Sequence, residues 1–194
     1  MDGFNILSAS ALGNVGVEFR LVGVADFNGD GRADLLFRRP DGTLTLYLMN
    51  GAQIVAAQVL GNVGTEWDIA GVADFNGDGR ADMLFRRRSD GMLSLYLMDG
   101  FQVLSAQLLG TVGQEWSLAG VRDFNGDGRA DMLFRRNDGN LSLYLMNGFQ
   151  VLAAQILGNV GIEWRAVGVR DFNGDGKATS CSAAPATDCF RCTS

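Results

Sequence analysis

The stretch Asp26-Phe27-Asn28-Gly29-Asp30-Gly31-Arg32-Ala33-Asp34 decides the fold of this chain, because it recurs at a regular interval. Copies begin at residues 26, 74, 123 and 171, so successive copies lie 48, 49 and 48 residues apart. The fourth copy has Thr179 at the position where the other three end in an aspartate. A period near 50 residues indicates a propeller or another array of β-units.

Oxygen-bearing side chains occupy positions 1, 3, 5 and 9 of each complete copy, and glycine occupies positions 4 and 6. This spacing is typical of a short loop that wraps around one hard cation, with the backbone carbonyl of position 7 as a further ligand. Three carboxylates in one loop repel each other unless a cation lies among them. The pattern therefore predicts a Ca²⁺ site in each complete copy. It does not predict an EF-hand, because the twelfth-position Glu and the flanking helices of that motif are missing.

The composition narrows the function classes. The net charge is -6, and eleven of the 22 acidic residues lie in the four loops, so nucleic acid is not an expected partner. The chain has no His, and its three Cys lie in the last stretch, so the repeats offer no His- or Cys-based catalysis and an enzyme is not expected. No apolar run is long enough to span a bilayer, and no secretion signal is visible at the N-terminus.

Each repeat unit is predicted to contain four antiparallel strands. In the second unit these are residues 67–73, which lead into the acidic loop, then 83–87, 93–98 and 102–109. Asp90-Gly91 and Asp99-Gly100 supply the hairpin turns between the later strands. The third strand alternates between two faces, and the short Gly-rich connections leave no window of helical length. Four strands at this period indicate an all-β propeller blade.

The loop motif, followed by Met/Leu-Leu-Phe-Arg, resembles the FG-GAP/VCBS repeat family over nearly all of residues 1–178. The resemblance implies a calcium-binding β-propeller and an extracellular or cell-surface location for the parent protein. It implies these metal ligands, with position 7 acting through its carbonyl: Asp26, Asn28, Asp30, Arg32 and Asp34; Asp74, Asn76, Asp78, Arg80 and Asp82; Asp123, Asn125, Asp127, Arg129 and Asp131; and, in the incomplete copy, Asp171, Asn173 and Asp175.

The two ends depart from the repeat. Met1–Leu7 aligns with Met98–Leu104, so three full blades with partial end strands are expected in residues 1–178. Residues 179–194 do not continue the repeat. Codons can be chosen for this tail that encode the expected repeat when read in a neighbouring frame, so we expect a frameshift-derived, disordered tail. The open ends predict a homo-oligomer, most simply a dimer that completes a ring.

Two further residue patterns leave alternatives open. The Glu-Trp pairs containing Trp67, Trp116 and Trp164 are consistent with blade packing or with an exposed carbohydrate-binding surface. The arginine runs beginning at Arg38, Arg86 and Arg135 pair with loop or turn carboxylates at the strand ends, lie solvated, or hold an anionic partner. The expected function is therefore a non-catalytic calcium-binding scaffold, with a calcium-dependent lectin as the alternative.

Overall fold

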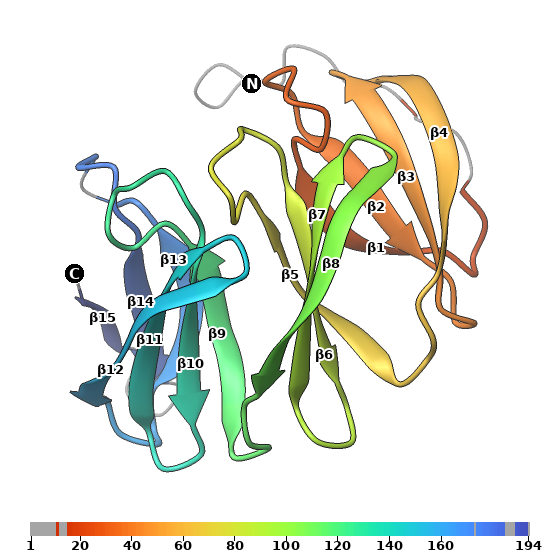
Figure 1. Cartoon of the computed structure of the whole chain (residues 1–194). Coiled ribbons are helices and arrows are strands. Elements are labelled where there is room, and N and C mark those ends of the chain that lie inside the picture. Colours follow the sequence, from red (N-terminus) through yellow and green to blue (C-terminus); the bar gives the residue numbers. More distant parts are fainter. Residues whose placement is uncertain (1–10, 12–14, 173, 185–188, 194) are drawn as a thin grey trace.

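The computed structural model describes residues 11, 15–172, 174–184 and 189–193. These residues form β-strands, turns and connecting segments, and no helix occurs among them (Figure 1). Accordingly, no helix able to cross a membrane is found in the described part of the chain. The residues expected to form a strand at the N-terminus, Met1–Leu7, lie outside the described residues.

Three four-stranded antiparallel sheets form blades 1, 2 and 3, each a meander in chain order. Blade 1 contains β1 (Arg20–Ala25), β2 (Asp34–Arg38), β3 (Thr43–Asn50) and β4 (Gln53–Asn62). Blade 2 contains β5 (Trp67–Ala73), β6 (Asp82–Arg87), β7 (Met92–Asp99) and β8 (Gln102–Thr111). Blade 3 contains β9 (Trp116–Arg122), β10 (Asp131–Arg136), β11 (Asn140–Asn147) and β12 (Gln150–Asn159). The predicted four-strand unit is confirmed, and the strand boundaries in blade 2 agree within two residues.

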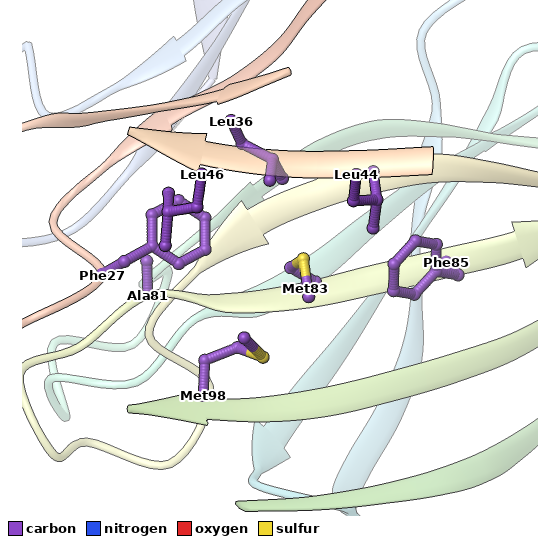
Figure 2. Close-up of a cluster of buried hydrophobic side chains, with 8 residues drawn as sticks. All are labelled: Phe27, Leu36, Leu44, Leu46, Ala81, Met83, Phe85 and Met98. Atoms are coloured by element: carbon purple, nitrogen blue, oxygen red, sulfur yellow. The ribbon is translucent and has the colours of Figure 1, made fainter. Parts of the chain in front are cut away.

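The hydrophobic core lies between the blades. One cluster joins the second and third strands of blade 1 to blade 2, as Figure 2 shows for Phe27, Leu36, Leu44, Leu46, Ala81, Met83, Phe85 and Met98. A second cluster joins blades 2 and 3 in the same way. Met83 and Phe85 face blade 1 while Leu84, between them, belongs to the second cluster. Strand β6 is therefore buried on both faces, which explains why the second strand of each repeat is apolar without alternation.

The first strands of successive blades lie side by side and pack very closely. A Cβ atom on Gly71 would lie 2.6 Å from a methyl group of Val121, and one on Gly120 would lie 2.6 Å from a methyl group of Val169. Glycine is needed at these two positions because neighbouring first strands approach closely. The last strand of each blade is mostly solvent-exposed, and β12 is exposed along its whole length.

The C-terminal sheet contains β13 (Arg165–Arg170), β14 (Thr179–Ala184) and β15 (Cys189–Thr193), paired in that order. The tail was expected to be disordered and β13 to be unpaired, and the structure corrects both expectations for these residues. The register of β14 on β13 repeats that of β10 on β9, because Ala183 faces Arg165 as Arg135 faces Ser117. The buried Cys181 on β14 is disulfide-bonded.

Candidate metal-binding loops

Four acidic loops join the first and second strands of the sheets. They are loop 1 (residues 26–34), loop 2 (74–82), loop 3 (123–131) and loop 4 (171–179). The glycines at positions 4 and 6 have positive φ in all four loops, for example 80° at Gly77 and 83° at Gly79. These left-handed conformations turn the backbone tightly, and they favour glycine over residues with a side chain. The repeated Gly-x-Gly therefore fixes one loop conformation in every unit.

The aspartate at position 1 organises the backbone of its loop. In loop 1 the Oδ1 atom of Asp26 accepts hydrogen bonds from the N–H groups of Asn28, Gly29 and Asp30 at 3.2, 2.7 and 3.2 Å. Its Oδ2 atom accepts from the N–H of Gly31 at 2.7 Å. In loops 2 and 3 the glycines at positions 4 and 6 donate to the position-1 carboxylate in the same way. The inner wall of each loop is thus lined by backbone donors facing one carboxylate.

The side chains at positions 3 and 5 face each other at the exposed side of the loop. In loop 2 the amide of Asn76 donates to Asp78 at 3.0 Å, and its oxygen accepts from the N–H of Asp78 at 3.0 Å. Asp78 in turn accepts from the N–H of Arg80 at 2.8 Å. The same two-residue spacing recurs in loop 3 with Asn125 and Asp127. Positions 1, 3 and 5 therefore place carboxylate and amide oxygens around one turn of backbone.

The aspartate at position 9 is buried beneath the loop, and its side chain is 0% exposed in loops 1, 2 and 3. In loop 2 the Oδ2 atom of Asp82 accepts from the N–H of Phe75 at 2.9 Å, and Oδ1 accepts from the N–H of Met98 at 2.9 Å. Asp34 and Asp131 make the equivalent pairs of bonds. This carboxylate therefore joins the start of the loop to the end of the third strand. The sequence did not predict this structural role.

The buried carboxylates carry an electrostatic cost. Burial raises the pKa of Asp82 to about 7, although the N–H groups of Met98 and Phe75 oppose the shift. The nearby carboxylates of Asp78 and Asp74 raise this pKa further. Burial also raises the pKa values of Asp34 and Asp131, and the acidic neighbours in their own loops add to the effect. A positive charge beside these groups would relieve the repulsion among the carboxylates of each loop.

A family model described as an FG-GAP-like repeat matches residues 26–85, 74–134 and 123–178. Each match begins at an acidic loop, and together they span almost four fifths of the sequence. The chain belongs to the FG-GAP-like repeat family. The family resemblance predicted from the loop motif is therefore confirmed, and so is the β-propeller fold class with three full blades.

Other comparisons add little to the family assignment. None of the curated proteins matches the FG-GAP chain. Among solved structures, the crystal structure of glutaminyl cyclase from Myxococcus xanthus is 16% identical, with a TM-score of 0.38. That match covers 88% of the FG-GAP chain and 73% of the cyclase chain. This likeness is too weak to carry an argument about activity.

The oxygen donors of the FG-GAP loops match the ligands that Ca²⁺ prefers, namely carboxylates, amide oxygens and backbone carbonyls. Among the described residues, however, no group of three or more acidic, His or Cys side chains is gathered in a way that holds a metal ion. The carboxylate at position 9 bonds to two backbone N–H groups in the core. Each carboxylate oxygen carries two lone pairs, so those bonds leave acceptor capacity at position 9.

Loop 4 keeps part of the FG-GAP arrangement. Asp171 accepts from the N–H groups of Gly174 and Gly176 at 2.6 and 3.0 Å, and Asp175 accepts from the N–H of Lys177 at 2.8 Å. The predicted ligand Asn173 lies outside the described residues. Thr179 is buried at position 9, where it supplies a hydroxyl in place of a carboxylate. The backbone of the loop is therefore retained without the buried acid.

Successive acidic loops are joined by backbone hydrogen bonds between blades. The N–H of Ala81 in loop 2 donates to the carbonyl of Asp26 in loop 1 at 2.6 Å. Ala130 and Ala178 make the same bond to Asp74 and Asp123, at 2.6 and 2.7 Å. The loops thus form one continuous row at one end of the propeller. Sequence reasoning missed this connection, because the bond uses backbone groups that every residue carries.

Three arginines that end or nearly end the second strands, Arg38, Arg86 and Arg135, reach the connection to the next sheet; we call them the interblade arginines. Arg38 donates to the carbonyls of Trp67, Val63 and Gly64 at 2.5, 3.0 and 2.7 Å. Arg86 donates to Val112 and Gly113, and Arg135 donates to Gly161. The expectation that the arginine runs pair with carboxylates is wrong for these three residues. It is confirmed for the next arginine of each run, which pairs with an acid: Arg39 with Glu18, Arg87 with Asp90 and Arg136 with Asp138.

The tryptophans proposed as sugar platforms are half-buried in the FG-GAP fold. Trp67 and Trp116 pack against the two interblade cores. The guanidinium carbon of Arg87 lies 5.3 Å from the centre of the Trp67 ring, and Arg136 lies 5.4 Å from that of Trp116. Trp164 is also half-buried. Core packing and a stacked arginine partly cover the rings of Trp67 and Trp116, which favours the packing role for these two residues.

Proposed function

We propose that this chain is a calcium-binding propeller module that serves as an interaction scaffold and not as a catalyst. The observation that carries the proposal is the threefold recurrence of one loop conformation, with oxygen donors at positions 1, 3 and 5 on the same end of the blades. Ca²⁺ takes six to eight oxygen ligands, and each complete loop offers side-chain and carbonyl oxygens of this kind.

Each complete loop would hold one ion through the side chains of positions 1, 3, 5 and 9 and the carbonyl of position 7. For loop 2 these are Asp74, Asn76, Asp78 and Asp82, with the Arg80 carbonyl. Because the four loops are joined by backbone hydrogen bonds, order gained in one loop extends to the next. Calcium would then stiffen the whole loop end of the propeller.

Melting experiments test this proposal. At calcium about 100-fold above Kd, each site adds about 3 kcal/mol to the free energy of unfolding, which raises Tm by about 5–11 °C for a chain of this size. Wild-type protein should therefore melt at higher temperature in Ca²⁺ than in EDTA. Asp78→Ala should reduce this difference, while Asp90→Ala, a hairpin acid outside the loops, should leave it unchanged. Identical wild-type curves in EDTA and in excess Ca²⁺ would contradict calcium binding.

The scaffold role rests on what the repeats contain and lack. There is no His in the sequence, and the repeats contain no Cys to act as a nucleophile. For the parent protein, an extracellular or cell-surface location is expected from the family, and calcium is abundant there. A protein ligand is the expected partner, since two of the tryptophans that a lectin would use, Trp67 and Trp116, pack against the interblade cores and against arginines.

Assembly with a second copy is the proposed way to complete the ring. Close contacts between first strands run from β1 to β5, β9 and β13, and in the described residues no comparable contact joins β13 back to β1. The arc of blades is therefore open, and the exposed end faces of two copies would pack against each other. Light scattering at micromolar concentration should give a dimer mass. A monodisperse monomer would count against this assembly.

A further inference from the structure

An arginine-lined cavity opens between blades 1 and 2, at the end of the blades away from the acidic loops. Its volume is about 400 Å³, within the range of small-molecule sites. The charged residues that line it are Arg20, Arg38, Arg39, Arg88 and Asp68, with Thr65 and Ile69 among the neutral ones. We call this cavity the arginine pocket. Four guanidinium groups around one carboxylate make it strongly positive in a protein whose net charge is -6.

The acids near the arginine pocket do not neutralise it. Both oxygens of Asp68 accept hydrogen bonds from Arg88, at 2.9 Å from Nε and 2.5 Å from a terminal nitrogen. Arg38 donates to neutral backbone carbonyls, and the described acid whose charge it influences, Asp68, is already paired with Arg88. Arg39 lies 3.4 Å from Glu18, and both side chains are more than two-fifths exposed, so water screens that pair.

Arg20 adds to the positive charge of the arginine pocket. In blade 2 the equivalent position is Asp68, and in blade 1 the equivalent of Arg88 is Pro40. Blade 1 therefore lacks the Asp–Arg pair of blade 2 and carries an arginine in place of the acid. No described residue pairs with the Arg20 guanidinium. The equivalent positions in the four sheets are Arg20, Asp68, Ser117 and Arg165, so among them only blade 2 carries an acid.

The corresponding cavity between blades 2 and 3 provides an internal comparison. It is lined by Arg86, Arg87 and Arg88 together with Asp68. Here Arg87 is paired with Asp90 at 2.5 Å, and Arg88 with Asp68. Only the interblade arginine Arg86 lacks a carboxylate partner in that cavity. Among the described residues, the arginine pocket therefore has two guanidinium groups without a carboxylate partner, Arg20 and Arg38, and the cavity between blades 2 and 3 has one.

We propose that the arginine pocket binds a tetrahedral oxyanion, a phosphate or sulfate group. Guanidinium groups are always charged and present parallel N–H donors that match the oxygens of such groups. Arg20 and Arg39, which are exposed and lack buried acids, would donate to the anion, and Arg38 would add its field from the pocket wall. The site uses no residue of the acidic loops, so anion binding can be tested independently of calcium binding.

Calorimetric titration in metal-free buffer at constant ionic strength tests the proposal, with inorganic phosphate, inorganic sulfate and a monosaccharide sulfate as probes. Saturable binding is expected, with shifts in the amide NMR signals of Thr65 and Ile69 and not in that of Gly79 in loop 2. Tighter binding of the sugar sulfate than of sulfate would identify an ester as the ligand. The reverse order would identify the free ion.

Variants show whether the pocket is responsible. Arg20→Ala removes charge-assisted hydrogen bonds and should weaken binding about ten-fold or more. Arg39→Ala should weaken it independently, and this variant keeps the test valid if Arg20→Ala fails to fold. Arg170→Ala, which removes an exposed arginine on β13, is the matched control and should change Kd less than two-fold. No saturable binding, or equal loss in Arg20→Ala and Arg170→Ala, would overturn the proposal.

Discussion

Blade 3 and the C-terminal sheet share a register but differ in what their second strands carry. Both β10 and β14 pair with the preceding strand through the same residue alignment and the same irregularity beside a glycine. All six aligned positions differ, among them Asp131 and Thr179, Met132 and Ser180, Phe134 and Ser182, and Arg135 and Ala183. Backbone pairing thus survives the loss of the repeat sequence, whereas the side chains that join one blade to the next are lost.

The cost of that loss is visible between the two sheets. Where Met132 and Phe134 fill the core between blades 2 and 3, a cavity of about 480 Å³ opens between blade 3 and β14. Its lining includes Phe124, Leu133 and Ser180. Strand pairing therefore sets the position of a blade, and apolar side chains from its second strand supply the packing. The predictions below exchange residues between the two strands, from the largest effect to the smallest.

Met132→Ser should have the largest effect. The Met132 side chain is 1% exposed within the core between blades 2 and 3, so its removal leaves a cavity and buries a hydroxyl group. We expect a loss of about 3–5 kcal/mol in the free energy of unfolding, measured by urea denaturation.

The reverse exchange is the matched control. Ser180→Met places an apolar side chain in the cavity beside β14 and should stabilise the protein by about 1 kcal/mol. If Ser180→Met lowered the free energy of unfolding about as much as Met132→Ser does, the C-terminal sheet would already be fully packed. The proposed difference in packing between blade 3 and the C-terminal sheet would then be wrong.

Asp131→Ala should have the next effect. The Asp131 carboxylate accepts hydrogen bonds from the N–H groups of Phe124 and Met146, each at 2.9 Å. In Asp131→Ala both N–H groups would lose this acceptor. We expect a loss of about 2–4 kcal/mol in metal-free buffer, where calcium plays no part. Asp131→Asn, which keeps one oxygen, should lose less.

Thr179→Ala is the control for this position. Thr179 provides no carboxylate to its loop, so we expect a loss below about 1 kcal/mol. If thermal and urea denaturation gave equal losses for Thr179→Ala and Asp131→Ala, the buried aspartate would not have the structural role described above.

Arg135→Met should have the smallest effect of the three. The Arg135 guanidinium donates to the Gly161 carbonyl at 2.7 Å, but its buried Nε has no hydrogen-bond partner. We expect a loss of about 1–2 kcal/mol in urea denaturation. Arg170→Met, at an exposed position on β13, should lose less than about 0.5 kcal/mol. Equal losses in the free energy of unfolding for Arg135→Met and Arg170→Met would mean that an interblade arginine contributes no more to stability than a surface arginine.

The sequence predicted the parts of this structure that depend on local spacing. The Gly-x-Gly pair fixed the loops, Asp90-Gly91 fixed a hairpin, and the apolar residues around Leu84 located a strand buried on both faces. Roles that depend on distant backbone groups had no such signal. The partners of Arg38 and Asp82 are carbonyl and N–H groups, which are the same at every residue. For the tail, the small residues around Cys181 indicated no strand, and pairing with β13 overrides their weak preference.

Anomalous diffraction from crystals grown with Ca²⁺ tests most directly whether the acidic loops hold calcium. We predict one peak in each of loops 1, 2 and 3, about 2.3–2.6 Å from the carboxylate oxygens at positions 1 and 5. Loop 4, with Thr179 at position 9, should give a weaker peak. If loops 1, 2 and 3 showed no peak and kept only the hydrogen bonds described above, the proposal that these loops bind calcium would be wrong.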